Sequence, residues 1–238
     1  MAVSRQATSG KRTAETGPRA RMKKVMLDTA MELMERGVIP SVSEVAEAAA
    51  VSRATAYRYF PSQAAMIQEA VDEALGPILD WHSDSPEAEA RVSELIAFAY
   101  PRMETYETTL RAALQLAIAQ WAQRQAGTFG DEQPIVRGNR KGLLAEAVRP
   151  LRGQMPKPAF DRLMQSLSLI FGTEALVVLK DIWGLDGAEA RKVAVWAAHA
   201  LVGAAVHEVR PARPGKPGRR TVKKSASILQ KKDRARLN

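Results

Sequence analysis

Apolar residues between Arg19 and Arg36 fall three or four positions apart, which places them on one face of a helix. Gly37 and Pro40 follow, and both residue types favour the end of a helix. The same spacing returns in several segments between residues 87 and 209, most strongly over Pro158–Trp183 and Gly187–Val209. No segment shows the period-two, β-branched pattern of a strand, so the sequence predicts an all-α protein.

Two short helical segments follow the first helix. Ser41-Val42-Ser43-Glu44 has the pattern of a capping box, in which Ser41 accepts from an amide of the first turn and Glu44 reaches back. A break at Ala50-Val51 separates this helix from a third one at Arg53–Phe60, which Ser52 can cap. Two short helices joined so tightly, over residues 41–60, are typical of a helix-turn-helix, whose second helix lies in the major groove of DNA.

A fourth helix is expected from Gln63 to about Leu75, because Gly76-Pro77 disfavours its continuation. The polar, turn-rich segment 80–86 then marks a boundary. We therefore predict a three-helix DNA-binding domain at 19–77 and a second helical domain at 86–209.

The net charge of +9 is unevenly distributed along the chain. Residues 1–24 contain seven Lys/Arg and one Glu, residues 210–238 contain eleven Lys/Arg and one Asp, and residues 25–209 carry a net charge of −7. We interpret 1–18 as a disordered basic arm and 210–238 as a disordered basic tail. Such segments attract nucleic acid by releasing its counterions, although a solvated tail that aids solubility is an equally good interpretation of either one alone.

Several classes of function are excluded by what the sequence lacks. Without cysteine, disulfide scaffolds, Cys-based zinc sites and thiolate catalysis are ruled out, and His82, His199 and His207 are too widely spaced for a metal site. No phosphate-binding glycine loop or nucleophile elbow is present, so neither an enzyme nor a bound cofactor is expected. No apolar stretch reaches the ~20 residues of a membrane span, and no signal peptide is evident, so a cytoplasmic protein without membrane contact is expected.

The third helical segment carries the groups that a helix in the major groove needs: arginines, hydroxyls and aromatic rings, with no acidic residue. Arg58 could pair with guanine through two hydrogen bonds, and Thr55 could offer its hydroxyl to a base. The first amides of this helix, with Ser52, suit a phosphate. Phe60 is expected in the core, whereas Tyr57 could pack inward and place only its hydroxyl on a phosphate.

The motif as a whole consists of Ser41-Val42, Val45-Ala46, Ala50-Val51-Ser52 and the run Thr55-Ala56-Tyr57-Arg58-Tyr59-Phe60-Pro61-Ser62. With these residues, the segment 19–75 resembles the DNA-binding domain of the TetR family of bacterial transcriptional regulators, and the helices up to about residue 209 match the family's architecture. The resemblance implies DNA contacts from the start of the second helix and along the third, at Ser41, Ser43, Ser52, Arg53, Thr55, Tyr57, Arg58, Tyr59 and Gln63.

Two residues depart from the family pattern. Ala50 stands where the family usually has Gly, so the turn must avoid a positive φ or accept strain of about 1 kcal/mol or more. Gln63 stands where a phosphate-binding Lys is common, which weakens one contact. The basic residues Lys11, Arg12, Arg19, Arg21, Lys23 and Lys24 are expected to compensate by reaching along the backbone or into a minor groove.

The resemblance also implies a ligand pocket and a dimer interface within 86–209. Aromatic and flexible residues are the pocket candidates, although each alone is more typical of core packing than of ligand contact: Phe98, Met103, Tyr106, Leu114, Leu116, Trp121, Phe129, Phe160, Met164 and Phe171. The last two helical segments are more apolar than one buried face requires. A four-helix interface with a second copy is therefore expected, at Leu176, Leu179, Val193, Trp196, Leu201 and Ala204.

The implied function is that of a homodimeric, sequence-specific repressor. It would bind a pseudo-palindromic operator in double-stranded DNA and be released by a small apolar or amphipathic inducer. The alternative is an architectural protein that binds nucleic acid without sequence preference through its basic tails.

Overall fold

A computed structural model describes residues 17–131 and 133–209. The predicted basic tail lies outside these residues, as does the predicted arm up to residue 16. The described residues form helices and the loops that connect them, and their only strand-like pairing is an isolated bridge between Arg152 and Met155. The prediction of an all-α protein is therefore confirmed.

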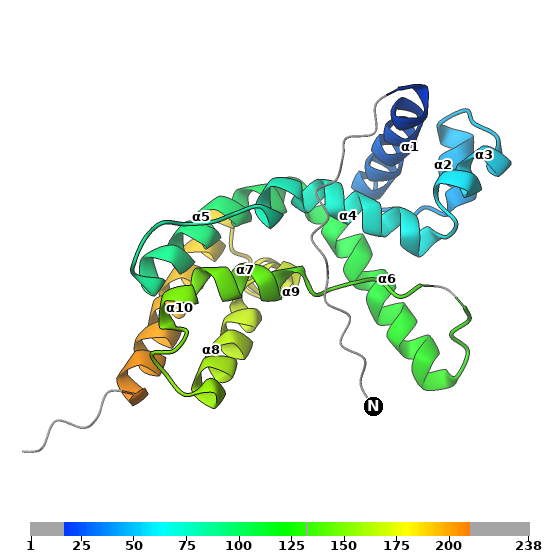
Figure 1. Ribbon diagram of the computed structural model, residues 1–238. Helices are drawn as coiled ribbons and strands as arrows, with labels where there is room; N and C mark the ends of the chain where they lie inside the picture. The colour runs from blue at the N-terminus through cyan, green and yellow to red at the C-terminus, as the bar shows by residue number, and fades with distance from the viewer. Residues whose placement is uncertain (1–16, 132, 210–238) are drawn as a thin grey trace, which may run out of the picture.

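Four helices form one end of the molecule (Figure 1): α1 (Pro18–Glu35), α2 (Val42–Ala48), α3 (Arg53–Tyr59) and α4 (Gln63–Leu79). Their apolar faces meet in a small core that includes Met26, Val45 and the fully buried Phe60. Phe60 thus has the core position expected from the sequence. Ala112 also belongs to this core, so the C-terminal helices contribute to the packing of the N-terminal ones.

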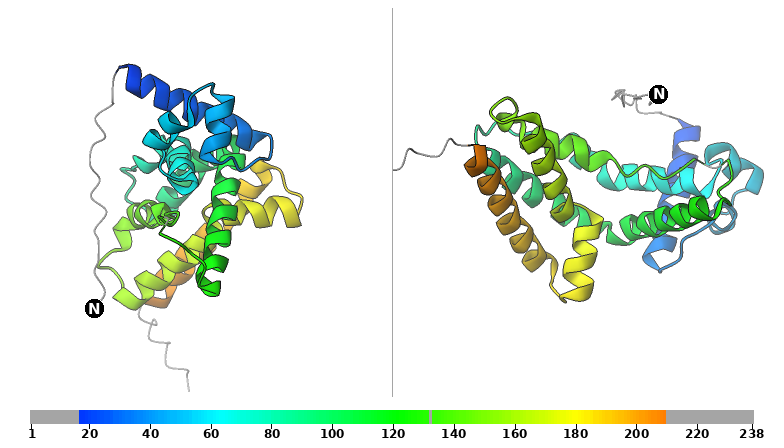
Figure 2. Two further views of the ribbon diagram at one scale, coloured as in Figure 1. Left: turned by 90° about the vertical axis from the view of Figure 1, so that its right-hand side faces the viewer. Right: turned by 90° about the horizontal axis from the view of Figure 1, so that it is seen from below.

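The remaining helices form the body of the molecule. They are α5 (Ala88–Thr105), α6 (Glu107–Ala126), α7 (Asn139–Ala147), the 3₁₀ turn η1 (Arg149–Leu151), α8 (Lys157–Ile170), α9 (Thr173–Val177), the π-helical turn η2 (Val178–Ile182) and α10 (Gly187–Val209). α10 packs along α5 and lies beside α8, as Figures 1 and 2 show. α4 contributes Ile67, Val71 and Ile78 to the body's core, so this helix is shared by both ends.

The predicted end of the fourth helix at Gly76-Pro77 is wrong, because α4 continues through Pro77 to Leu79. Proline lacks an amide hydrogen, so the carbonyl of Glu73, four residues earlier, loses its usual donor. The guanidinium of Arg102, on α5, donates to this Glu73 carbonyl at 3.0 Å and to the Ala74 carbonyl at 2.6 Å. A side chain from another helix therefore replaces the bond that proline removes.

The predicted continuous helix at 158–183 is also wrong. α8 ends at Ile170, Phe171 turns into the core in an extended conformation, and Gly172 follows with φ +129°. The helix after this break runs at 47° to α8. The apolar pattern continues across the break because both pieces cover the same core, which is why periodicity alone joined them.

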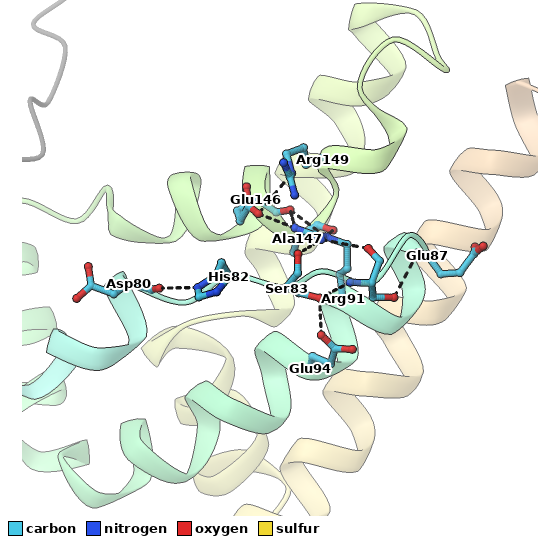
Figure 3. Close-up of polar contacts among 10 residues, drawn as sticks. Asp80, His82, Ser83, Glu87, Arg91, Glu94, Glu146, Ala147 and Arg149 are labelled. Atoms are coloured by element: carbon cyan, nitrogen blue, oxygen red, sulfur yellow. Dashed lines mark hydrogen bonds and ion pairs between the residues drawn. The ribbon is translucent and has the colours of Figure 1, made fainter.

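The segment 80–86 is held against the body by one buried cation (Figure 3). Arg91, on α5, is 1% exposed and donates to the carbonyls of Ser83, Ser85, Glu146 and Ala147. It also pairs with the carboxylate of Glu146 at 2.6 Å. A buried charge requires hydrogen-bond partners and an opposite charge, and Arg91 has both. Its hydrogen bonds connect the segment between α4 and α5 to the end of α7.

Among the described helices, none is alone both long and apolar enough to cross a membrane. Lys157–Ile170 and Thr173–Ile182 reach that length and composition only together, as a bent pair.

Candidate nucleic-acid interface and ligand cavity

The start of α2 is closed by the capping box expected from the sequence. The Ser41 hydroxyl accepts from the Glu44 amide at 3.2 Å, and the Ser41 amide donates to the Glu44 carboxylate at 2.7 Å. Hydrogen bonding of the Glu44 carboxylate, first by the Ser41 amide and then by the Ser41 hydroxyl, lowers the pKa of Glu44. Ser41 thus caps α2, while Ser43 lies two residues further on, in the first turn of the same helix.

The turn between α2 and α3 contains the described residues' only non-glycine position with positive φ. Ala50 has φ +54°, so the turn accepts the strain rather than avoiding it. The Val51 amide donates to the Ala46 carbonyl at 2.9 Å and the Ala50 amide donates to the Glu47 carbonyl at 3.1 Å. This is the hydrogen-bond pattern of a Schellman motif, in which the left-handed residue is usually Gly.

α3 begins at a second serine cap. The Ser52 hydroxyl accepts from the Thr55 amide at 3.2 Å and donates to the Thr55 hydroxyl at 2.9 Å. Arg53, Tyr57 and Arg58 are exposed on this helix, whereas Ala56 is buried against the core. The cap fixes the orientation of a short helix whose outer face presents two arginines.

Aromatic contacts connect α3 to its neighbours. Tyr57 is 47% exposed, and its hydroxyl lies 3.4 Å from the Ser43 hydroxyl of α2, within hydrogen-bond distance. Two guanidinium groups lie near the Tyr59 ring, with the Cζ atom of Arg19 at 5.8 Å and that of Arg58 at 5.7 Å from the ring centre. The candidate residues on α2, α3 and the start of α1 therefore share one surface.

The Gln63 side chain contacts the connection between α1 and α2. Its side-chain amide donates to the carbonyls of Ile39 at 3.3 Å and Pro40 at 3.1 Å. Gln63 thus fastens the connection between α1 and α2 rather than extending freely from the surface. Of the basic residues expected to compensate, Lys23 pairs with Glu69 and Lys24 with Asp28, while Lys11 and Arg12 lie outside the described residues.

Residues 26–70, from the middle of α1 into α4, match the family described as bacterial regulatory proteins, tetR family. The helix-turn-helix end of the chain is therefore similar to that of TetR-family proteins. Two solved structures share its fold, both described as TetR-type transcriptional regulators. The one from Streptomyces coelicolor has a TM-score of 0.58 at 18% identity, covering 82% of this chain and 90% of the other. The one from Rhodococcus sp. RHA1 has a TM-score of 0.52 at 16% identity, covering 78% and 97%. A search of curated proteins found no match.

The helical body of the chain contains a cavity of about 90 Å³ between α4, α5, α6 and α7. Its walls are mainly apolar and come from Val71, Leu75 and Ile78 of α4, Met103 of α5, Leu110, Ala113 and Leu114 of α6, Ile135, Val136, Leu143 and Phe171. Ile135 and Val136 belong to the loop before α7, and hydrogen bonds to two helices hold this loop in place. The amide of Val136 donates to Gln68 of α4 and that of Ile135 donates to Gln120 of α6, each at 2.9 Å.

Three of the predicted pocket residues, Met103, Leu114 and Phe171, line this cavity, and the others lie elsewhere. Phe98 is 48% exposed on α5, and Trp121 is 58% exposed beside a second hollow on the outside of α6. Tyr106 lies under the Arg102 guanidinium and Phe129 under that of Arg124, while Leu116, Phe160 and Met164 pack partly buried against the core. Aromatic residue type alone therefore did not identify the cavity walls.

The polar end of the cavity was not recognised from the sequence. Arg137, Asn139, Arg140, Thr173 and Glu174 line it, and both arginines pair with the Glu174 carboxylate. The partners are 34 and 37 positions apart, so no local pattern connects them.

The predicted dimer residues divide into two groups. Val193, Trp196 and Ala204 are exposed on α10, with Trp196 at 73%, and Leu201 and Leu179 are partly buried. Leu176 is buried in the core of its own chain, where a second copy cannot reach it. Further exposed apolar side chains nearby in the sequence are Leu169 of α8, at 78%, and Ile182 of η2.

Proposed function

We propose that this TetR-family regulator is a homodimeric repressor that binds a pseudo-palindromic operator and is released by a small apolar or amphipathic ligand. The observation that carries the DNA-binding part is the outer face of α3. It presents Arg53, Tyr57 and Arg58 without an acidic residue, on a helix capped by Ser52 and held to α2. Repression rather than activation is the role implied by the family.

The contacts at this face favour distinct roles for its side chains. Arg58, exposed beside the Tyr59 ring, would read a base, preferably guanine. Tyr57 and Ser43 share a hydrogen bond and would contact the phosphate backbone together. Gln63, held by Ile39 and Pro40, would present its main chain rather than its amide to the DNA.

Ligand response is supported by the position of α4. This helix supplies Val71, Leu75 and Ile78 to the cavity wall, and Met66 and Ala70 to the core beneath α1–α3. A ligand that widens the cavity would therefore displace the helix that carries the DNA-binding end. The ligand must bind the released conformation more tightly than the DNA-bound one, because equal affinity would shift nothing.

Dimer formation is supported by the apolar side chains that α8, η2 and α10 leave exposed, among them Leu169, Ile182 and Trp196. Burying them against the same face of a second copy would remove a large apolar surface from water. Two copies related by a two-fold axis would place two α3 helices against successive major grooves.

The test is fluorescence anisotropy at physiological salt with the DNA upstream of the protein's own gene and with a scrambled duplex. Arg58→Ala is expected to lower affinity for the upstream DNA by roughly tenfold or more, because a bidentate base contact is lost, with little change for scrambled DNA. Lys157→Ala, which removes a cation far from α3, serves as the matched control and should behave as wild type.

The non-specific alternative predicts a different result. Equal affinity for both duplexes, indifferent to Arg58→Ala but abolished by deleting residues 210–238, would mean that the tail binds DNA and that α3 does not read it.

A further inference from the structure

Two arginines and one glutamate stand at the polar end of the cavity. Arg137 and Arg140 both direct a guanidinium nitrogen at the carboxylate of Glu174, and all three residues line the cavity. The charged residues that line it therefore leave a surplus of one positive charge. Every other wall is apolar except for Asn139 and Thr173 beside this cluster and the backbone of Gly172.

Arg140 is the more deeply placed of the two arginines. Its side chain is 22% exposed, and it also donates to the Ser168 carbonyl at 3.1 Å. Burial lowers the pKa of Arg140, and the charge of Arg137 lowers it further. A cation in this setting is stabilised by any additional anion that reaches it.

The beginning of α7 adds to the positive potential at the same end. Asn139 and Arg140 are its first residues, its N-cap is Gly138 without a side-chain cap, and its first turn has no acidic residue. The partial positive charge of this helix end is thus offset by no local carboxylate.

We propose that the cavity binds an organic acid, whose compact apolar body contacts Val71, Met103 and Leu143 and whose carboxylate takes the place of Glu174 on Arg137 and Arg140. This inference rests on the proposed ligand response and names the ligand class. A cationic ligand would be repelled by the two arginines. A neutral molecule would gain nothing from the surplus charge, whereas a carboxylate accepts paired hydrogen bonds from both guanidinium groups.

The test is isothermal titration calorimetry on the full chain without DNA. The probes are benzoate, hexanoate and octanoate, each beside its neutral amide of nearly the same shape. At least one acid is expected to bind, and its amide is expected to bind about tenfold more weakly or worse, because the charge-assisted hydrogen bonds are lost.

Two variants at the polar end separate charge recognition from general damage. Arg137→Gln should weaken acid binding about tenfold, because one charged donor is removed. Glu174→Gln should strengthen it by a similar factor, because the competing carboxylate is gone, and misfolding cannot produce a gain. Lys157→Gln, on an exposed cation outside the cavity, should leave the affinity unchanged.

The proposal is overturned if no acid binds, if the amides bind as tightly as the acids, or if Glu174→Gln weakens acid binding. The proposed function is judged separately by anisotropy. Operator-specific DNA binding without acid binding refutes the ligand class alone. Acid binding that leaves the operator complex intact refutes the ligand response and keeps the ligand class.

Discussion

Ala50 determines how α2 meets α3, and it does so in a conformation that alanine adopts at a cost. Its φ of +54° brings Cβ close to the backbone, a position that glycine occupies without strain. The Schellman hydrogen bonds and the buried residues on both sides, Ala46 and Ala56, hold the turn in place. Strain at this turn is thus offset by packing of the two helices that present the candidate DNA-binding face.

Ala50→Gly is expected to stabilise the protein by about 0.5–1 kcal/mol, since relief of strain exceeds the added flexibility of the unfolded chain. Urea unfolding followed by circular dichroism measures this. Ala119→Gly, at an exposed position inside α6, should have the opposite sign and destabilise by about 1 kcal/mol. A destabilising Ala50→Gly would show that the turn is not strained.

Glu44 makes the capping box sensitive to pH. Its pKa is lowered from the ordinary 4.5 by hydrogen bonds from Ser41, first from the amide and then from the hydroxyl. A carboxyl whose pKa is lowered by folding stabilises the fold fully at pH values above its ordinary pKa. This stabilisation is lost as the pH falls through the lowered pKa.

In an NMR titration, the Glu44 pKa should therefore lie below 4.5 in wild type and rise toward that value in Ser41→Ala. Ser52→Ala removes the corresponding cap of α3, which has no acidic partner, and should leave the Glu44 pKa unchanged. An unaltered Glu44 pKa in Ser41→Ala would contradict the role of the cap.

At the scale of helices, α4 shows how one element passes through a residue that normally ends it. Pro77 leaves the Glu73 carbonyl without a helical donor, and Arg102 of α5 supplies one. The hydrogen bonds from Arg102 also hold α4 against α5. A gap in the hydrogen bonding of one helix thus becomes a connection between two.

A double-mutant cycle tests this coupling. Arg102→Leu should destabilise the protein by about 1–3 kcal/mol, because two helical carbonyls lose a charged donor. In the Pro77→Ala background, where the amide of residue 77 can bond to Glu73, the same change should cost clearly less. Strictly additive effects in urea unfolding would show that Arg102 does not act on the proline gap.

For the whole molecule, the predicted boundary at 80–86 separates the helices less fully than expected. Ala112 of α6 packs in the N-terminal core, and α4 contributes to the cores at both ends. Arg91 additionally ties the connecting segment to α7. Because of this shared packing, a movement of α4 at the cavity would also move the helices beneath the candidate DNA-binding face.

The proposed dimer can be tested at its most exposed aromatic residue. Trp196→Arg should convert a dimer to a monomer in sedimentation velocity and weaken operator binding, because a charge replaces a large apolar contact. Trp121→Arg, on an equally apolar exposed position of α6, should remain dimeric. A dimer that survives Trp196→Arg would place the interface elsewhere.

The sequence by itself determined the features that depend on residues a few positions apart. Helical periodicity, the Ser41 and Ser52 caps and the motif ending at Phe60 follow from interactions within one or two turns. These were enough to predict the fold class, the helix-turn-helix and the match of residues 26–70 to the tetR family. Even the strain at Ala50 was one of two alternatives visible in the sequence.

Only the tertiary structure decided the features that join distant segments. The continuation of α4 depends on Arg102, the role of Gln63 on Ile39 and Pro40, and the polar end of the cavity on Arg137, Arg140 and Glu174. The same holds for the predicted pocket, since Phe98 and Trp121 are exposed while aliphatic residues line the cavity. Residue type states what a side chain can do, but the packing of helices decides which side chains meet.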